Sequence, residues 1–360
     1  MENEVYKRMI EPDIRIYTSD MELIGFSSDV TSLQWTRKYN EPGDFELHMA
    51  LSEDNINYIK KECIVWLFGA KEAGVIERIE KSVGDEPELV ASGRFLSSYL
   101  DRRLIRPFYS IDNGLVETAM REIYTKAVAI PRVSLGDRIG ITDKITFQAT
   151  YKNLLAYEEK LAAYAGIGFR FRPEFSARSI TFELYKGVDR SIAQSDRARV
   201  IFADEFANLS SAEYVYSSED YKNVCYVGGK GEGSARTFVT VGDDALSGLD
   251  RREYFLSATD VESDNQTDAQ YKAALKQRGT DKLEELAESV SLTAKISPDG
   301  NYKYKTDYDL GDIVTITVPN LGISMNERIT EVKEIYERDG YQIELTVGTP
   351  TADTIDFDDD

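Results

Sequence analysis

Apolar residues recur at every second position in short runs along much of this chain, and turn-forming residues separate the runs. Leu33, Trp35 and Tyr39 share one side of such a run with Arg37, and residues 179–185 alternate in the same way. A period of two is the side-chain period of a β-strand. The pattern therefore predicts an α+β, β-rich fold in which sheets dominate.

The first 100 residues are predicted to form a small β-barrel, because antiparallel meanders of short strands close most readily into barrels or sandwiches. Pro42 and Gly43 interrupt the alternation just before Phe45. Proline presets φ and glycine accepts a positive φ, so this dipeptide predicts a type II turn. The expected strands are residues 13–17, 22–25, 31–39, 45–49, 63–68 and 73–81.

Helical periodicity appears in the next segment, which we interpret as an α+β insert over residues 101–195. One helix is expected to follow an N-cap at Asp112–Asn113 and to reach Ala127. A second helix is expected over residues 151–165, with Thr150 as its cap and Gly166 as its stop. A hairpin built on residues 167–171 and 179–185 completes the unit.

Strand-like runs return after this insert and predict a second β-barrel made of residues 196–260 and 291–350. A helical insert over residues 261–290 interrupts it, since Thr267 and Gln270 form a capping box and apolar residues continue at helical spacing to Val290. The turn Asp339–Gly340 is expected to lead into the last strand. Residues 351–360 are acidic and predict a disordered tail.

Composition excludes several classes of protein. Lys and Arg number 43 against 64 Asp and Glu, so the net charge is 43 − 64 = −21, which disfavours binding to nucleic acid phosphates. The longest apolar run, residues 63–68, is too short to span a membrane, and the N-terminus lacks the pattern of a secretory signal. Cys63 and Cys225 are expected to be reduced and buried. The single histidine, His48, is expected to face solvent and cannot by itself support a zinc cluster or a histidine-based triad.

A glycine-rich stretch invites comparison with a phosphate-binding loop. Gly228, Gly229, Gly231 and Gly233 surround Lys230, but a P-loop requires Ser or Thr after its lysine and then a helix. A strand follows instead, so we interpret the cluster as a hairpin or bulge in which small residues allow close approach of another backbone.

Paired carboxylates keep a glycosidase possible, since Asp307 with Asp309, or Glu334 with Glu337, could flank a sugar. Acidic strand surfaces give the same pattern in a chain of this charge. We therefore predict no catalytic residue, no metal site and no cofactor. Arginines cluster at Arg94, Arg102, Arg103 and Arg106, and again at Arg251–Arg252, where the choice lies between surface salt bridges and subunit contacts.

Several local motifs follow one another in a fixed order between about Ile14 and about Gly348. They are Ser32–Arg37 with Glu41–Leu47, Gly93–Leu96 with Leu100–Arg103, Lys186–Arg190, Tyr221–Val224 with Gly228–Gly233 and Arg236, Arg251–Glu253, and Asp309–Val314. In their order and spacing these motifs resemble the siphovirus ReqiPepy-type tail hub family.

The resemblance implies a non-enzymatic hub at the tail tip or baseplate of a phage or phage-derived particle, assembled in the bacterial cytoplasm. Such hubs carry two related barrels per chain and form homotrimers, so six barrel units match a tail tube of sixfold symmetry. Implied partners are a distal tail or tail tube protein, a tape measure protein, and a spike, fibre or lysin protein below. DNA would pass through the lumen without specific binding, and no membrane insertion is implied. Hubs of the lysin type continue into a peptidoglycan-cleaving domain, and we expect no such extension here, because the sequence departs from that pattern after its acidic last residues.

Thirteen residues are candidates for structural or interface roles on this interpretation. Trp35, Pro42, Gly43 and Phe45 would organise the first barrel, Asn223, Gly228, Gly231, Gly233 and Arg236 the second, and Arg94, Arg102, Arg251 and Arg252 would make subunit contacts. Two alternatives stay open, namely a tail-tip cell-wall hydrolase and a receptor- or glycan-binding module. The sequence does not distinguish a long flexible tail from a contractile phage or a bacteriocin-type particle.

Overall fold

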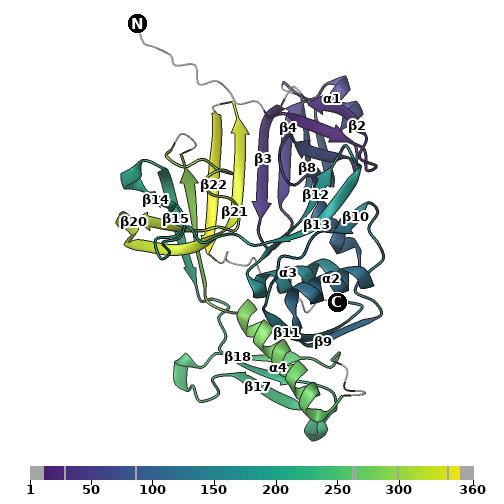
Figure 1. Cartoon of the computed structure of the whole chain (residues 1–360), viewed down its shortest axis with the longest axis vertical. Coiled ribbons are helices and arrows are strands. Elements are labelled where there is room, and N and C mark those ends of the chain that lie inside the picture. Colours follow the sequence, from purple (N-terminus) through teal and green to yellow (C-terminus); the bar gives the residue numbers. More distant parts are fainter. Residues whose placement is uncertain are drawn as a thin grey trace.

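The computed structural model describes residues 12–348, apart from positions 28, 29, 86, 262, 264, 265, 298, 299 and 339. This part of the chain contains four α-helices and five sheets (Figure 1), which confirms the predicted α+β, β-rich class. The expected acidic tail and Asp339 of the expected turn lie outside the described residues.

The N-terminal module encloses its core between two sheets. One sheet has the strand order β2-β1-β5-β6, and the other contains β3, β4, β8 and β7. Trp35, Phe45 and Ile16 lie in the core between them. The elements are β1 (Ile14–Tyr17), β2 (Leu23–Ser27), β3 (Val30–Lys38), β4 (Asp44–Ala50), α1 (Glu53–Tyr58), β5 (Ile64–Leu67), β6 (Gly74–Val75), β7 (Arg78–Ser82), β8 (Glu88–Arg94) and the 3-10 helix η1 (Leu96–Arg102).

Gly43 closes the connection between β3 and β4, but the predicted type II turn is wrong because φ of Gly43 is not positive. A Cβ atom at this position would lie 2.1 Å from the backbone oxygen of Thr36 and 2.8 Å from the ring of Phe95. The glycine is therefore required by close packing, and the buried Pro42 precedes it in the same connection.

The α+β segment follows and has its own core, with helices α2 and α3 packed on short strands. Its elements are β9 (Phe108–Leu115), α2 (Val116–Lys126), β10 (Val133–Leu135), β11 (Lys144–Thr150), α3 (Leu154–Ala165), β12 (Gly168–Glu174) and β13 (Ser179–Tyr185). β12 and β13 form the expected antiparallel hairpin.

Both predicted N-caps in this segment are wrong, whereas the predicted stop is confirmed. Asp112 and Asn113 lie inside β9, because this stretch pairs with β11 and the helix begins only at Val116. Asn153 rather than Thr150 caps α3, with its side chain accepting from the backbone N–H of Ala156. Gly166 ends that helix in the left-handed conformation, as expected.

The C-terminal module surrounds a second core. Its elements are β14 (Ile201–Ala203), η2 (Asp204–Phe206), β15 (Leu209–Ser217), β19 (Ser289–Ile296), β20 (Ile313–Val318), η5 (Pro319–Leu321), β21 (Ile323–Glu337) and β22 (Gly340–Gly348). The long strand β21 pairs first with β20 and then with β22. The expected helix end at Val290 is wrong, since this residue lies in β19.

Residues between β15 and β19 form a separate insert rather than part of the second barrel. A three-stranded sheet packs against helix α4 around its own small core. The elements are β16 (Val224–Gly228), η3 (Gly233–Ala235), β17 (Phe238–Gly242), η4 (Gly248–Asp250), β18 (Glu253–Ser257) and α4 (Asp268–Glu285). The capping box of Thr267 and Gln270 is confirmed. None of the described helices is long and apolar enough to cross a membrane.

One ten-stranded sheet contains a set of four strands from each module, and the two sets have the same order. β14 and β20 of the C-terminal module also belong to this sheet but pair off this path. Numbered along the chain within each set, the order is first, second, fourth, third: β3-β4-β8-β7 in one module and β15-β19-β22-β21 in the other. Every neighbouring pair within both sets is antiparallel. This shared order is what two related modules would have.

The sets are joined edge to edge because β21 pairs with β3 in antiparallel fashion. Figure 1 shows these strands side by side at the centre of the molecule, one yellow and one purple. The result is a continuous path of eight strands, β15-β19-β22-β21-β3-β4-β8-β7, with β15 and β7 at its two ends.

The two cysteines are free and buried, as predicted. His48 does not simply face solvent, because Glu46 and Glu88 each contact one of its ring nitrogens at 2.9 Å. Partial burial opposes the charged ring, but these two carboxylates outweigh it and raise the pKa of His48.

Candidate functional site at the junction of the two modules

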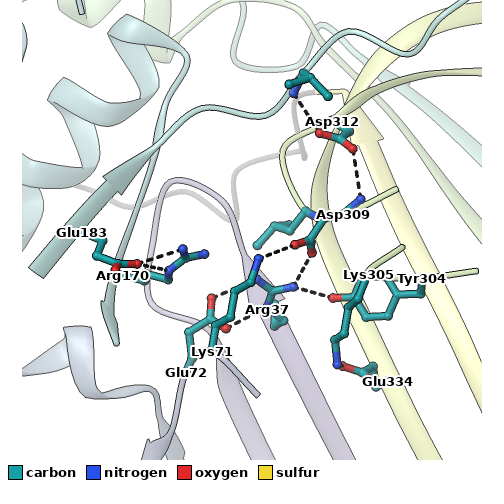
Figure 2. Close-up of polar contacts among 12 residues, drawn as sticks. Arg37, Lys71, Glu72, Arg170, Glu183, Tyr304, Lys305, Asp309, Asp312 and Glu334 are labelled. Carbon is teal, nitrogen blue, oxygen red and sulfur yellow. Dashed lines mark hydrogen bonds and ion pairs between the residues drawn. The ribbon is translucent and has the colours of Figure 1, made fainter. Parts of the chain in front are cut away.

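Arg37 lies at the seam between the modules, in β3 and opposite Val332 of β21. Its side chain is 2% exposed and its guanidinium reaches both modules (Figure 2). Two bonds go to Glu72 of the N-terminal module, with Nε to Oε2 at 2.9 Å and Nη2 to Oε1 at 3.2 Å. Nη1 donates to Asp309 Oδ1 and to the hydroxyl of Tyr304, both at 2.6 Å.

Electrostatics favour the charged forms of this cluster. Burial opposes the charge on Arg37, but Glu72, Tyr304 and Asp309 outweigh it and raise the pKa of Arg37 well above its ordinary value. Burial likewise opposes ionisation of Asp309, yet Arg37 and Lys71 hold the pKa of this carboxyl well below its usual range. Lys71 Nζ lies 2.9 Å from Asp309 Oδ2. Arg37 and Asp309 are therefore both ionised throughout the physiological range.

Glu334 forms a second node on β21, directly opposite Trp35 of β3. Its buried carboxylate accepts from Lys305 Nζ at 2.8 Å and from the hydroxyls of Tyr336 and Tyr341 at 3.1 and 2.9 Å. Burial and the nearby Glu334 charge raise the pKa of both tyrosines, so the hydroxyls stay protonated and donate.

Asp312 ties the segment before β14 to the start of β20. Its two carboxylate oxygens accept from the backbone N–H of Val188 at 2.8 Å, from Arg190 Nε at 2.9 Å and from the backbone N–H of Asp309 at 3.1 Å. The Tyr39 hydroxyl bridges nearby, accepting from the N–H of Gly187 and donating to the carbonyl of Gly166. The junction thus joins both modules to the α+β segment.

This arrangement of charges is suited to fixing the position of the two modules relative to each other. The carboxylates of Glu72, Asp309, Asp312 and Glu334 each contact at least one cationic side chain. Buried ion pairs of this kind are geometrically specific, because moving either partner leaves an uncompensated charge. Within the described residues, no group of three or more His, Cys, Asp or Glu side chains could hold a metal ion.

The two ends of the eight-strand path form the second part of the candidate site. Neither β7 nor β15 has a second partner strand in the described part of the chain. Tyr214, Val215 and Tyr216 in β15 are 39%, 37% and 53% exposed. Monomeric proteins protect sheet edges, and exposed apolar rows mark interaction surfaces. We therefore treat these two edges as candidate interfaces.

The residues predicted to organise the first module lie together in its core. Trp35 is fully buried, with ring centroids 6.0 Å from Phe45 and 4.6 Å from Phe95. Gly43 contacts the same Phe95 ring, and the buried Pro42 is its neighbour.

The residues predicted to organise the second barrel lie in the insert instead. Asn223 donates to the carbonyl of Asp250 and accepts from the N–H of Arg252, which ties β16 to β18. Gly228 makes room for the Arg236 guanidinium, which would lie 2.7 Å from a Cβ atom there. Gly231 and Gly233 take positive φ in the loop that follows, which fits the predicted hairpin glycines. The module around the second core contains none of these five residues.

The four arginines proposed for subunit contacts all have partners within the chain. Arg94 pairs with Glu77 and Asp101, and Arg102 pairs with Glu62. Arg251 pairs with Asp244 and Glu253, while Arg252 donates to the carbonyl of Ser218. Contacts of these arginines with another subunit stay a prediction.

The sequence analysis named Arg37, Asp309 and Glu334 but did not join them into one network. The available signal was the place of Arg37 on the apolar side of an alternating strand, beside Trp35. A charged residue on a core-facing side predicts a buried partner. Its partners lie 35 and 272 positions away, so only the fold identifies them.

Comparison with known proteins gives one family match. The family described as "Siphovirus ReqiPepy6 Gp37-like protein" matches residues 13–349. No curated protein sequence matches the chain.

Three solved structures of tail proteins have a similar fold. A tail protein from Neisseria meningitidis MC58 aligns with a TM-score of 0.58 and 13% identity, over 94% of this chain and 96% of the other. The 43 kDa tail protein of prophage MuSo2 from Shewanella oneidensis aligns with a TM-score of 0.56 and 14% identity, over 93% and 98%. Prophage tail protein gp18 from Listeria monocytogenes EGD-e aligns with a TM-score of 0.53 and 14% identity, over 93% of this chain and 94% of the other.

Proposed function

The chain belongs to the siphovirus ReqiPepy6 Gp37-like family, and on this premise we propose that it is a structural hub of a phage or phage-derived tail. Three copies would form a ring at the tail tip or baseplate. The ring would join the tail tube above to a spike, fibre or lysin protein below. Its role would be geometric rather than enzymatic.

The observation that carries this proposal is the repeated strand order in one open-ended sheet. Within the chain, β21 of the second set pairs with β3 of the first. By position in the shared order, β7 corresponds to β21 and β15 corresponds to β3. The internal junction is therefore a template for pairing β7 of one copy with β15 of the next. Because neighbouring strands alternate in direction along the whole path, this pairing would also be antiparallel.

Pairing of this kind is heterologous, since different surfaces of the two copies meet, and such contacts close into rings when the rotation fits. Three chains with two modules each would present six similar units around the axis. A ring of this kind matches a sixfold tube on one side and a threefold component on the other. We propose three copies because hubs of the family that the chain resembles are expected to form homotrimers.

The side of the sheet away from the two cores would line the channel. Two cations on this side pair with carboxylates, namely Lys295 with Glu344 at 2.9 Å and Lys38 with Asp44 at 3.6 Å. These two are then not free to bind phosphate groups, and the chain as a whole carries a net charge of −21. DNA would pass without being held.

Light scattering after size-exclusion chromatography, combined with negative-stain imaging, tests the ring directly. We expect a mass of three chains and threefold rings. A monomer at every concentration, or a twofold dimer, would contradict the proposal. The alternatives have their own assays. If the protein clears purified cell wall and single carboxylate substitutions abolish the clearing, the hydrolase is favoured instead. Saturable binding on a glycan array would favour the receptor-binding module.

A matched pair of substitutions tests the edge. Tyr216→Asp places a charge on the exposed edge strand β15, where we expect the ring to dissociate. Leu249→Asp introduces the same charge at a side chain that is 97% exposed in η4, where no effect on assembly is expected. Equal effects would show that β15 is not the contact.

A further inference from the structure

A groove lies between the edge strand β2 and the short helix α1 in the N-terminal module. Its volume is about 450 Å³. Gly25 lets α1 pack closely on β2, because a Cβ atom at this position would lie 2.6 Å from the Tyr58 ring. The lining residues are Leu23, Ile24, Gly25, Phe26, Ser52, Asp54, Asn55 and Tyr58.

The strand beside this groove has an open edge. β2 pairs with β1 alone within the described residues, so one row of its backbone groups is available for a further strand. Large apolar side chains are exposed along it, with Leu23 at 49% and Phe26 at 56%. Phe68 is 53% exposed nearby, and Arg15 stacks on its ring at 3.6 Å from the centroid. An open strand edge flanked by exposed apolar side chains is the geometry that accepts an added strand.

The charge on the groove wall indicates what the added strand carries. Asp54 lines the groove from the first turn of α1, and Glu53 precedes it. Both side chains are exposed, and neither has a cationic partner in the described part of the chain. A lysine or arginine on the incoming segment would pair with Asp54, whereas an acidic segment would be repelled.

We propose that this groove binds an extended segment of another protein chain that alternates apolar and basic side chains. The segment would add to the free edge of β2, place apolar side chains beside Phe26 on one face of the sheet, and direct a basic side chain to Asp54 on the opposite face, where Tyr58 covers Gly25. β2 belongs to the four-stranded sheet and not to the eight-strand path, so this surface is separate from the proposed ring contact.

The test uses the full-length protein and a fluorescein-labelled peptide of seven residues in which valine and lysine alternate. We expect saturable binding in fluorescence anisotropy and slower amide exchange in residues 23–27 when the peptide is present. A second peptide with glutamate in place of lysine should bind at least tenfold more weakly. Equal binding of both peptides, or protection at another strand, would overturn the proposal.

Two adjacent carboxylates provide a matched pair of variants. Asp54→Lys reverses the charge on the groove wall, and we expect at least a tenfold loss of affinity for the lysine peptide. Glu53→Lys makes the same change in the same helical turn outside the groove lining, and we expect affinity within about threefold of the parent. Similar losses of affinity in both variants would show that only the net charge of the protein matters, and would overturn the proposed binding site. The parent protein could instead bind no peptide but self-associate, with Asp54→Lys abolishing the self-association. That result would identify a second copy of the chain as the occupant of the groove and would also overturn the proposal.

Discussion

Arg37 Nη1 and Asp309 Oδ1 lie 2.6 Å apart, although 272 positions separate the two residues in the chain. The bond crosses from β3 of one module to the loop before β20 of the other. Together with Glu72, it makes the junction of the two modules a buried charge cluster and not a purely apolar contact.

Replacing Arg37 should destabilise the protein strongly. Arg37→Leu leaves Glu72 and Asp309 without their buried cation, and we expect a loss of about 3–5 kcal/mol in the free energy of unfolding. Urea denaturation measures it. Arg78→Leu, at a side chain that is 71% exposed, is the control and should change stability by no more than about 0.5 kcal/mol. Similar losses in both variants would show that the cluster contributes little.

Asp309 should make stability fall in acid. Its pKa is lower in the folded protein than in the unfolded chain, where an aspartate has a pKa of about 3.9. Its contribution is therefore complete above that pH and is lost as pH falls below it toward the folded value. Asp309→Asn should lower stability at pH 7 and flatten the slope below about pH 4. An unchanged acid slope in this variant would contradict the assignment.

Glu158 should destabilise the α+β segment at neutral pH. It is fully buried in α3, and neither carboxylate oxygen has a hydrogen-bond partner among the described residues. Burial raises its pKa, so stability falls as pH rises above about 4.3, the value of an unfolded glutamate, until the folded group ionises. Glu158→Leu should add about 1–3 kcal/mol at pH 7 and remove that slope. Glu205→Leu, at an exposed position, is the control.

Gly43 and Gly84 should respond differently to the same substitution. Gly43→Ala forces a Cβ atom against Thr36 and Phe95, and we expect a loss of about 1–3 kcal/mol in thermal or urea unfolding. Gly84→Ala meets no atom within 4 Å, so it should be neutral or slightly stabilising. Tolerance of alanine at both positions would mean that the β3–β4 connection can move.

Disulfide cross-linking should locate the contact between copies. Glu80 in β7 and Glu213 in β15 lie on the polar side of the eight-strand sheet. Glu80→Cys combined with cysteine at Ser211, Glu213, Val215 or Ser217 should give cross-links between chains at one or two of these positions under mild oxidation. The native cysteines are buried and serve as the background. Cross-linking at none of the four would leave the ring without this contact.

Local patterns predicted most strands because alternation is a local property. The hairpin of residues 167–171 and 179–185 and the capping box at Thr267 agree with the structure for this reason. The α2 cap failed because pairing with β11 extended β9 through Asp112 and Asn113. The packing of Gly43 depends on Phe95, which is distant in sequence, so turn chemistry alone does not explain why a glycine is needed there.

Long-range partners explain the rest. The sequence showed Arg37 on the apolar side of a strand, but its partners are set by how the two modules meet. The insert was assigned to the second barrel because its strands have the same local pattern as those of the barrel. Only the pairing of β16 with β17 and β18 separates them.

Ser217 at the end of β15 pairs directly with Ser289 at the start of β19. The chain therefore leaves the eight-strand sheet for the insert and returns to it at neighbouring points. The corresponding strands β3 and β4 are connected by nothing more than a tight loop. The length of the insert can therefore change without altering the register in which β15 pairs with β19.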